Sequence, residues 1–380
     1  MFSSRSTFSP LFRLAALALA VALVGCDGGG ISSGSSSNGG GGPGGGAFNT
    51  SNCTIPTNRI VSGCDGADCI PSIDGITPDD DRLRTVDEAE DLDDGNRVIG
   101  IVLDGQALAV PHNVLWTHEI VNVDEWGGRS FAVTYCPLTG SSLAFDRSVI
   151  DGAEFGVSGL LFDNNLVMYD RRDERSLWPQ MSRQATCGAN VGESPSMVPL
   201  VEMKWGRWRE LHPETKVVSD GRGFNRSYPY GNYDPLAPGN TDAALETGPL
   251  FDMPVDDQRD PKERVLGLPN DSDGGLAVPF RELAEGGAVQ VVVAASGGRQ
   301  VTVFWNGDAQ AARAFETSRS FSVQDGQIVD DETGSVWSVE GRATEGPLAG
   351  TQLTTVDSSY VAFWFAWAAF QPQTVVWKRS

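Results

Sequence analysis

The sequence predicts a mainly β protein with a few short helices, in which two diverged copies of one β unit pack as a single globular body. Two observations carry this prediction. Apolar and polar residues alternate in several short runs that are separated by turn signals, and segments of the first half reappear in the same order in the second half. A chain of 380 residues is long enough for such a duplicated unit.

The chain is strongly acidic, with 28 basic and 50 acidic residues and a formal net charge of −22. Such a charge repels polyanions, so we expect neither nucleic acid nor an anionic membrane surface as a partner.

The N-terminus predicts an exported, lipid-anchored protein. Arg5 and Arg13 flank an apolar run that is too short to span a bilayer, which is typical of a signal peptide over residues 1–25. The run ends in LVGC, which resembles a bacterial lipobox and predicts that Cys26 carries the lipid. Residues 26–50 are rich in Gly and Ser and predict a flexible tether. Its part at 28–46, almost entirely Gly and Ser, would hold the folded part about 25 Å from the cell membrane or envelope.

Residues 51–97 form an acidic segment that contains Cys53, Cys64 and Cys69. Because an exported chain meets an oxidising compartment, we expect disulfides here. Cys64 and Cys69 are the favoured pair, and Cys53 then pairs with Cys187 or stays free. Zinc is the alternative, but the segment lacks the C-x2-C spacing of zinc sites.

Residues 98–200 are expected to form the first β repeat. Strands at 98–103 and 107–110 are joined by a turn at Asp104-Gly105. A short helix is predicted over 113–121, capped by Asn113 and with His118 and Glu119 in its last turn.

The stretch that follows carries the candidate site. Residues 131–135 alternate as a half-buried strand does, and Pro137 with the small polar residues after it ends that strand at Cys136. A return strand is predicted at 143–147, and a second hairpin over 155–170. A thiol at a strand end is either a reachable thiolate or a small buried hydrophobic group.

The second repeat is expected over residues 261–380. Leu108-Ala-Val-Pro111 is echoed by Leu276-Ala-Val-Pro279, and residues 131–145 are echoed by 301–315, where Asn306 replaces Cys136. A functional site would therefore lie in the first copy alone.

Two further segments complete the second half of the chain. Residues 201–260 are expected to form a long aromatic and Gly-rich connecting loop. The apolar residues 360–370 are expected to form a buried helix or strand, because the run is too short to span a membrane.

Several of these segments resemble the DUF3179 family of exported bacterial and archaeal proteins, whose members have no assigned reaction. The resemblance covers roughly residues 70–375, and it implies that His118 and Cys136 belong to one site, because they lie in its two most distinctive motifs. The matching segments are Trp116–Asn122, Thr134–Gly140, Phe155–Gly159, Asn165–Arg171, Ser176–Trp178, Gln180, His212-Pro213, Thr333–Ser335 and Phe363–Trp367.

The sequence predicts a small-molecule or peptide site around Cys136 and His118, and the first functional hypothesis is that this site serves a thiol-dependent enzyme of the cell envelope. Cys136 would be the nucleophile and His118 its base, with Glu119 or Asp170 orienting the imidazole. Arg171 would bind an anionic group of the substrate. The candidates for ligand contacts are Asp170, Arg171, Trp178, Gln180 and His112.

Two other classes of function stay open at this point. Cys136, His118 and His112 provide a thiolate and imidazoles that suit copper or zinc. A non-catalytic lipoprotein would instead bind a glycan, a peptide or a protein through its Trp- and Tyr-rich surface. The sequence assigns no cofactor and does not decide whether the protein is an enzyme.

Overall fold

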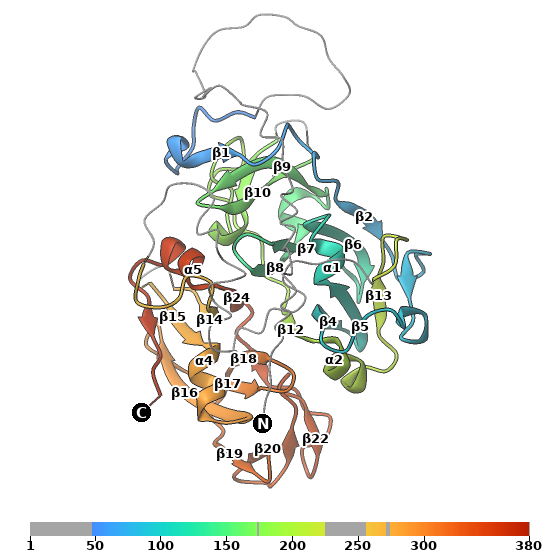
Figure 1. The fold of residues 1–380 in the computed structure, drawn as a ribbon, viewed down its shortest axis with the longest axis vertical. Helices are drawn as coiled ribbons and strands as arrows, with labels where there is room; N and C mark the ends of the chain where they lie inside the picture. The colour runs from blue at the N-terminus through green and yellow to red at the C-terminus, as the bar shows by residue number, and fades with distance from the viewer. Residues whose placement is uncertain (1–47, 173–174, 225–255, 271–273, 380) are drawn as a thin grey trace, which may run out of the picture. The chain divides into compact units, whose positions relative to one another are not determined.

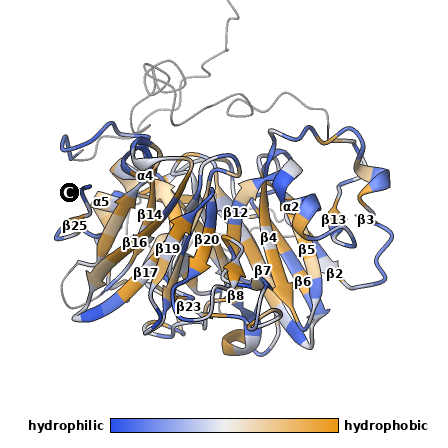
Figure 2. Ribbon diagram, turned by 90° about the horizontal axis from the view of Figure 1, so that it is seen from below, coloured by the Kyte–Doolittle hydropathy of each residue, from blue (hydrophilic) through white to orange (hydrophobic). Residues whose placement is uncertain are grey.

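The regular structure of this chain is mainly strand, as predicted. The computed structural model describes residues 48–172, 175–224, 256–270 and 274–379, whose strands pair in six sheets of four or five strands (Figure 1). Figure 2 shows that the strands are largely apolar and the connecting segments largely hydrophilic, which is expected for sheets that bury at least one face.

The first sheet is built on the hairpin that the Asp104-Gly105 turn predicts. Both turn residues have positive φ, 46° and 75°, which matches the right-handed twist of the flanking strands. The sheet has the order β12-β4-β5-β13-β3, with β3 at Leu83–Arg84, β4 at Arg97–Leu103, β5 at Gln106–Pro111, β12 at Val201–Lys204 and β13 at Lys216–Val218.

The second sheet contains the strand that ends at Cys136, as expected. Cys136 is the last residue of β7 and pairs with Ser141 across the β7–β8 turn. The sheet has the order β2-β6-β7-β8, with β2 at Ile73–Ile76, β6 at Ile120–Trp126, β7 at Arg129–Cys136 and β8 at Ser141–Asp146.

The third sheet contains the predicted hairpin over residues 155–170. Its turn residues Asp163 and Asn164 have φ of 51° and 64°, a conformation that Asp and Asn tolerate better than most residues. The sheet has the order β1-β9-β10-β11, with β1 at Ile60–Ser62, β9 at Phe155–Phe162, β10 at Asn165–Asp170 and β11 at Leu177–Pro179.

The predicted helix over residues 113–121 is wrong in length and in its cap. Helix α1 spans only His112–Leu115 and follows Pro111, while the Asn113 side chain donates to the Phe224 carbonyl. Glu119 has a φ of 59°, which ends any helix, and Ile120 already pairs with Thr134 in the sheet.

The expected loop over residues 201–260 is also wrong in its first part. Residues 201–218 form β12, helix α2 at Trp205–Leu211 and β13. Tertiary contacts decided this, because Trp205 and Trp208 are buried against the first sheet. The Tyr-rich remainder of the loop lies outside the described residues.

The second half of the chain forms the other three sheets. They have the orders β24-β14-β15-β25, β16-β17-β18-β23 and β19-β20-β21-β22. Their elements are β14 (Arg264–Leu268), β15 (Leu276–Pro279), α4 (Phe280–Gly286), β16 (Val289–Ser296), β17 (Arg299–Asn306), β18 (Ala311–Glu316), β19 (Phe321–Gln324), β20 (Gln327–Asp330), β21 (Val336–Trp337), β22 (Ala343–Glu345), β23 (Thr354–Thr355), β24 (Tyr360–Phe363), α5 (Trp364–Phe370) and β25 (Val375–Val376). The apolar segment 360–370 is thus a buried strand followed by a buried helix.

Two sheets in different halves share one pattern of strand pairing. Strands β12, β4, β5 and β13 pair as antiparallel, antiparallel and parallel, and β24, β14, β15 and β25 do the same. In each sheet a tryptophan from the following helix lies directly on a strand glycine, Trp208 on Gly100 and Trp367 on Gly267, where a Cβ would overlap the ring.

The two halves also contact each other reciprocally. The backbone N–H of Lys204 donates to the Ala309 carbonyl over 2.9 Å, and that of Phe363 donates to the Thr139 carbonyl over 2.8 Å. The β7–β8 turn, which follows Cys136, is therefore held from the second half of the chain.

The segment before β4 adds an edge strand to each of the first three sheets. Strand β1 pairs with β9 and β2 pairs with β6 (Figure 1). Strand β3 pairs with β13. The acidic N-terminal segment is thus an integral part of these sheets.

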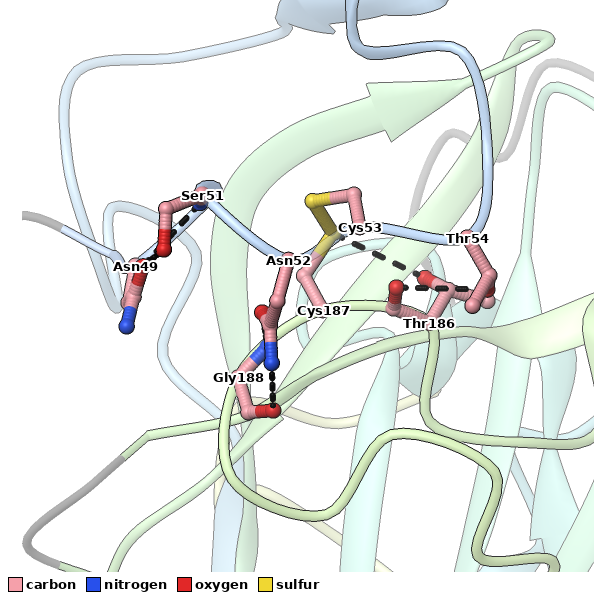
Figure 3. Close-up of a disulfide and its surroundings, with 8 residues drawn as sticks. All are labelled: Asn49, Ser51, Asn52, Cys53, Thr54, Thr186, Cys187 and Gly188. Carbon is pink, nitrogen blue, oxygen red and sulfur yellow. Dashed lines mark hydrogen bonds between the residues drawn. A yellow bond between two sulfur atoms is a disulfide. The ribbon is translucent and has the colours of Figure 1, made fainter.

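The structure contains the favoured Cys64–Cys69 disulfide, and of the two alternatives left open for Cys53 it contains the pairing with Cys187. Cys53 pairs with Cys187 over a separation of 134 residues, and the Asn52 side chain exchanges two hydrogen bonds with the Gly188 backbone beside it (Figure 3). Cys64 pairs with Cys69 over a separation of 5 residues. In the chain-entropy model the first bond contributes about 5 kcal/mol and the second about 2 kcal/mol.

The disulfides indicate a chain that folds in an oxidising compartment, so the protein is an exported one. Within the described ranges, no helix is both long enough and apolar enough to cross a membrane. The predicted signal peptide, lipidated Cys26 and most of the tether lie outside these ranges.

Candidate functional site

A cavity of about 300 Å³ lies beside the turn that follows Cys136. Its walls are mostly apolar, and the ionisable side chain in its lining is that of Glu119. The apolar side chains that form the walls are Ile70, Trp116, Leu138, Val157, Leu160 and Leu161. Concave apolar sites with one or a few polar groups are typical of small-molecule pockets.

Four separate segments of the chain build this pocket. The α1–β6 connection supplies Trp116 and Glu119, the β7–β8 turn supplies Leu138, and β9 supplies residues between Val157 and Leu161. The fourth wall is the loop closed by the Cys64–Cys69 disulfide.

Gly159 allows the disulfide loop to lie directly on β9. Its φ is 80°, and a Cβ at this position would meet the carbonyl oxygens of Cys64 and Gly66. The Gly159 carbonyl accepts hydrogen bonds from Gly63 N–H at 2.8 Å and Cys64 N–H at 3.2 Å. Sequence reasoning did not bring this loop to the site, because its Gly, Asp and Cys composition indicates only a turn.

Glu119 is the polar group of the pocket. The residue is only 9% exposed, and burial raises the pKa of its carboxyl to about 8. Among the described residues, no charged neighbour counteracts this rise of the pKa. The carboxyl is therefore predominantly protonated and uncharged at neutral pH.

Cys136 lies behind the pocket and does not line it. The thiol is 1% exposed, its sulfur accepts a hydrogen bond from Leu166 N–H at 3.3 Å, and its S–H faces the Asn164 carbonyl at 3.6 Å. Burial, with a smaller contribution from the charge of Glu119, raises the pKa of the thiol to about 11. These are the properties of a buried structural cysteine.

His118 makes its contacts away from the thiol. Its Nδ1 lies 2.6 Å from the Pro71 carbonyl, and its Nε2 lies 3.1 Å from Asp220 Oδ2 and 3.1 Å from an Arg222 guanidinium nitrogen. In the described part of the chain no hydrogen bond joins this ring to Cys136. The predicted nucleophile and base therefore have different partners.

The structure does not support the copper or zinc hypothesis. No group of three or more His, Cys, Asp or Glu side chains in the described residues could hold a metal ion. His112 is 1% exposed, lies 3.6 Å from Glu202 Oε2 and stacks on Tyr135. Burial lowers the pKa of its imidazole to about 3, so the ring stays neutral.

Three predicted contact residues belong to the third sheet or directly follow one of its strands. Asp170 is fully buried and accepts hydrogen bonds from Trp178 Nε1 at 2.9 Å and from Arg172 Nε at 3.2 Å. Trp178 packs edge-on against Phe155. Arg171 binds carboxylates of the protein itself, those of Asp68, Asp74 and Glu154. These side chains support the fold around the pocket.

Gln180 belongs to a buried hydrogen-bond network below the β7–β8 turn. Its amide donates to Thr134 Oγ1 over 2.9 Å, and its carbonyl oxygen accepts from Ser141 and from Asn165. Asn165 also donates to Thr139 Oγ1 over 3.0 Å. Every side chain in the network has a partner, so the turn has one preferred conformation.

The tryptophans of the expected aromatic surface are mostly core, and its tyrosines at 228, 230 and 233 lie outside the described residues. Eight of the ten tryptophans of the sequence are buried, and the two partly exposed ones are Trp116 and Trp377. Trp116 lines the pocket. Apart from this residue, the described tryptophans give little support to an exposed aromatic surface for a glycan or a protein.

We predict that the Cys136 thiol is unreactive in the folded protein. A Cys26→Ser protein has Cys136 as its free thiol. Iodoacetamide should modify this thiol at least about 100-fold more slowly in buffer at pH 8 than in guanidinium chloride. The reason is that burial both blocks access of the reagent to the sulfur and lowers the fraction of thiolate. Mass spectrometry of timed samples measures both rates. Rapid modification of the folded protein would contradict the burial described above.

We also predict that Glu119 makes the folded state less stable as pH rises. Its carboxyl binds its proton more tightly in the folded than in the unfolded chain, so the free energy of unfolding falls between about pH 4.5 and pH 8. Glu119→Gln removes this loss and should be more stable than the parent at pH 9 by about 3 to 5 kcal/mol, with little difference at pH 4.5.

Urea unfolding at several pH values measures this effect, and Glu125→Gln is the matched control. Glu125 is exposed and shares the positive φ of Glu119, 57° against 59°. The control should show no such dependence on pH. A constant difference between Glu119→Gln and the parent would mean that Glu119 titrates normally.

The comparisons with known proteins agree with the resemblance that the motifs suggested. Neither the curated proteins nor the solved structures include a match to this chain. The model of a family described as "Protein of unknown function (DUF3179)" matches residues 67–374, which include every wall residue of the pocket except Gly63 and Cys64. The chain therefore belongs to the DUF3179 family.

Proposed function

We propose that this protein binds a small, largely apolar molecule in the cavity between the Cys64–Cys69 loop and the β7–β8 turn. The observation that carries the proposal is the pocket itself, which has apolar walls and one buried carboxyl group. A buried carboxyl group without a charged neighbour costs free energy, and binding sites are where such costs are commonly found. The proposal keeps the small-molecule site predicted near Cys136 and replaces His118 by Glu119 as its main polar residue.

Thiol catalysis is the weaker alternative. A nucleophilic cysteine needs access and a lowered pKa, and Cys136 has neither. Its sulfur instead accepts the Leu166 N–H of β10 and so ties the end of β7 to the neighbouring hairpin.

We further propose that the two halves are diverged copies and that only the first keeps a ligand site. The shared strand pairing and the two Trp-on-Gly contacts support this proposal. Thr134 and Phe304 are equivalent positions of the two copies, and they pair with Ile120 and Val291. The residue before Ile120 is Glu119, and the residue before Val291 is Gln290. Gln290 thus takes the place of Glu119, and the second half lacks the acidic group.

The pocket is tested with ethylbenzene, an apolar probe of suitable size, in a thermal-shift or NMR titration. At ten times its dissociation constant the probe should stabilise the folded protein by about 1.4 kcal/mol. Leu138→Trp, which places a larger side chain in the cavity, should lose this effect. Val323→Trp, at an exposed position of β19, should keep it. Equal stabilisation of both variants, or none of the parent, would reject the pocket as a binding site.

We propose that the folded part is held at the cell membrane or envelope by a lipid on Cys26. The lipobox-like sequence and the disulfides of an exported chain support this location. In a bacterial host, Cys26→Ser should move the protein from the membrane fraction to the soluble fraction of the envelope, while Cys136→Ala should leave it in the membrane. Membrane retention of the Cys26→Ser protein would contradict the anchor.

A further inference from the structure

The chemistry of the pocket also indicates which class of molecule it accepts. This inference rests on the proposed binding function and adds a statement on charge. We propose that the pocket selects uncharged molecules with an apolar body and one hydrogen-bond acceptor, such as a carbonyl oxygen, and that Glu119 donates the hydrogen bond to this acceptor.

The geometry around Glu119 carries the first step of the argument. The residue follows helix α1 with a φ of 59°, and its backbone is fixed on both sides, because its N–H donates to the Leu115 carbonyl over 2.8 Å and its carbonyl accepts from Tyr135 N–H over 2.8 Å. A non-glycine residue in this conformation is unusual, and such positions cluster at functional sites. The side chain is thereby placed in the pocket lining.

The second step concerns charge. Apart from Glu119, the lining contains apolar side chains, glycines, a proline and a disulfide-bonded cysteine, and none of these is ionisable. The adjacent His118 has its ring nitrogens occupied by Pro71, Asp220 and Arg222, and the thiol behind the pocket is neutral. Within the described residues nothing stabilises an ionised carboxylate, so the group is a hydrogen-bond donor at neutral pH.

The third step is discrimination between ligands. An anionic ligand would lose its hydration in the apolar cavity and would find no cationic side chain there to compensate. Its charge would also disfavour ionisation of the nearby Glu119 carboxyl group. An ammonium group would first require Glu119 to lose its proton. A neutral acceptor needs neither change, and it satisfies a donor that is otherwise nine-tenths buried.

Three probes with the same phenyl skeleton compare a neutral acceptor with a cation and with a molecule that has no polar group. Acetophenone offers a neutral acceptor, 1-phenylethylamine offers a cation, and ethylbenzene offers neither. In NMR titrations of the folded, disulfide-bonded protein at pH 6, acetophenone should bind about 3- to 10-fold more tightly than ethylbenzene, which is the usual net effect of one hydrogen bond. This advantage should disappear at pH 9.5, where Glu119 is ionised.

Two variants assign the effect to Glu119. Glu119→Gln keeps a donor that does not titrate, so the preference for acetophenone should persist at both pH values. Glu119→Leu should bind ethylbenzene at least as well as the parent and lose the preference.

The outcomes distinguish this inference from the function on which it rests. Binding of ethylbenzene without a preference for acetophenone at pH 6 would overturn the role of Glu119 and leave the pocket in place. Tighter binding of 1-phenylethylamine would show that the carboxylate form acts and would also overturn the inference. Failure of all three probes to bind the parent would overturn the binding function itself.

Discussion

The buried network below the β7–β8 turn is the interaction on which the candidate site depends. The side chains of four fully buried residues satisfy one another by hydrogen bonds, namely Thr134, Ser141, Asn165 and Gln180. A buried polar group that loses its partner costs about 1 to 3 kcal/mol. The network therefore fixes the turn, and with it the position of Leu138 in the pocket wall. The second half of the chain adds to this constraint, because Phe363 donates to the Thr139 carbonyl and its ring lies on Gly140.

One physical cause explains the contrast between the two candidate catalytic groups. Burial disfavours the charged form of both Cys136 and Glu119, so the thiol cannot supply a thiolate and the carboxyl keeps its proton. The consequences differ because only Glu119 reaches the cavity. An environment that is unsuitable for a thiolate nucleophile thus suits a neutral hydrogen-bond donor.

The motifs that carry the family resemblance serve more than one purpose in the structure. Four of the motif residues are buried and are hydrogen-bonded or packed within the protein, namely Cys136, Asp170, Trp178 and Gln180. Trp116 and Glu119 line the pocket. A motif rich in Cys, His and Asp therefore does not by itself indicate catalysis, since the same residue types also satisfy one another in a core.

The sequence by itself determined the local features, because alternation, turn residues and cysteine spacing act over short distances. These features are the strand that ends at Cys136, the hairpin turns at Asp104-Gly105 and Asp163-Asn164, and the Cys64–Cys69 disulfide. Only the tertiary structure decided which side chains share a site. It ended the helix at Leu115, brought the Cys64–Cys69 loop onto Gly159 and separated the contacts of His118 from those of Cys136. The reason is physical, since burial and the pKa values that follow from it depend on segments distant in sequence, which no local pattern contains.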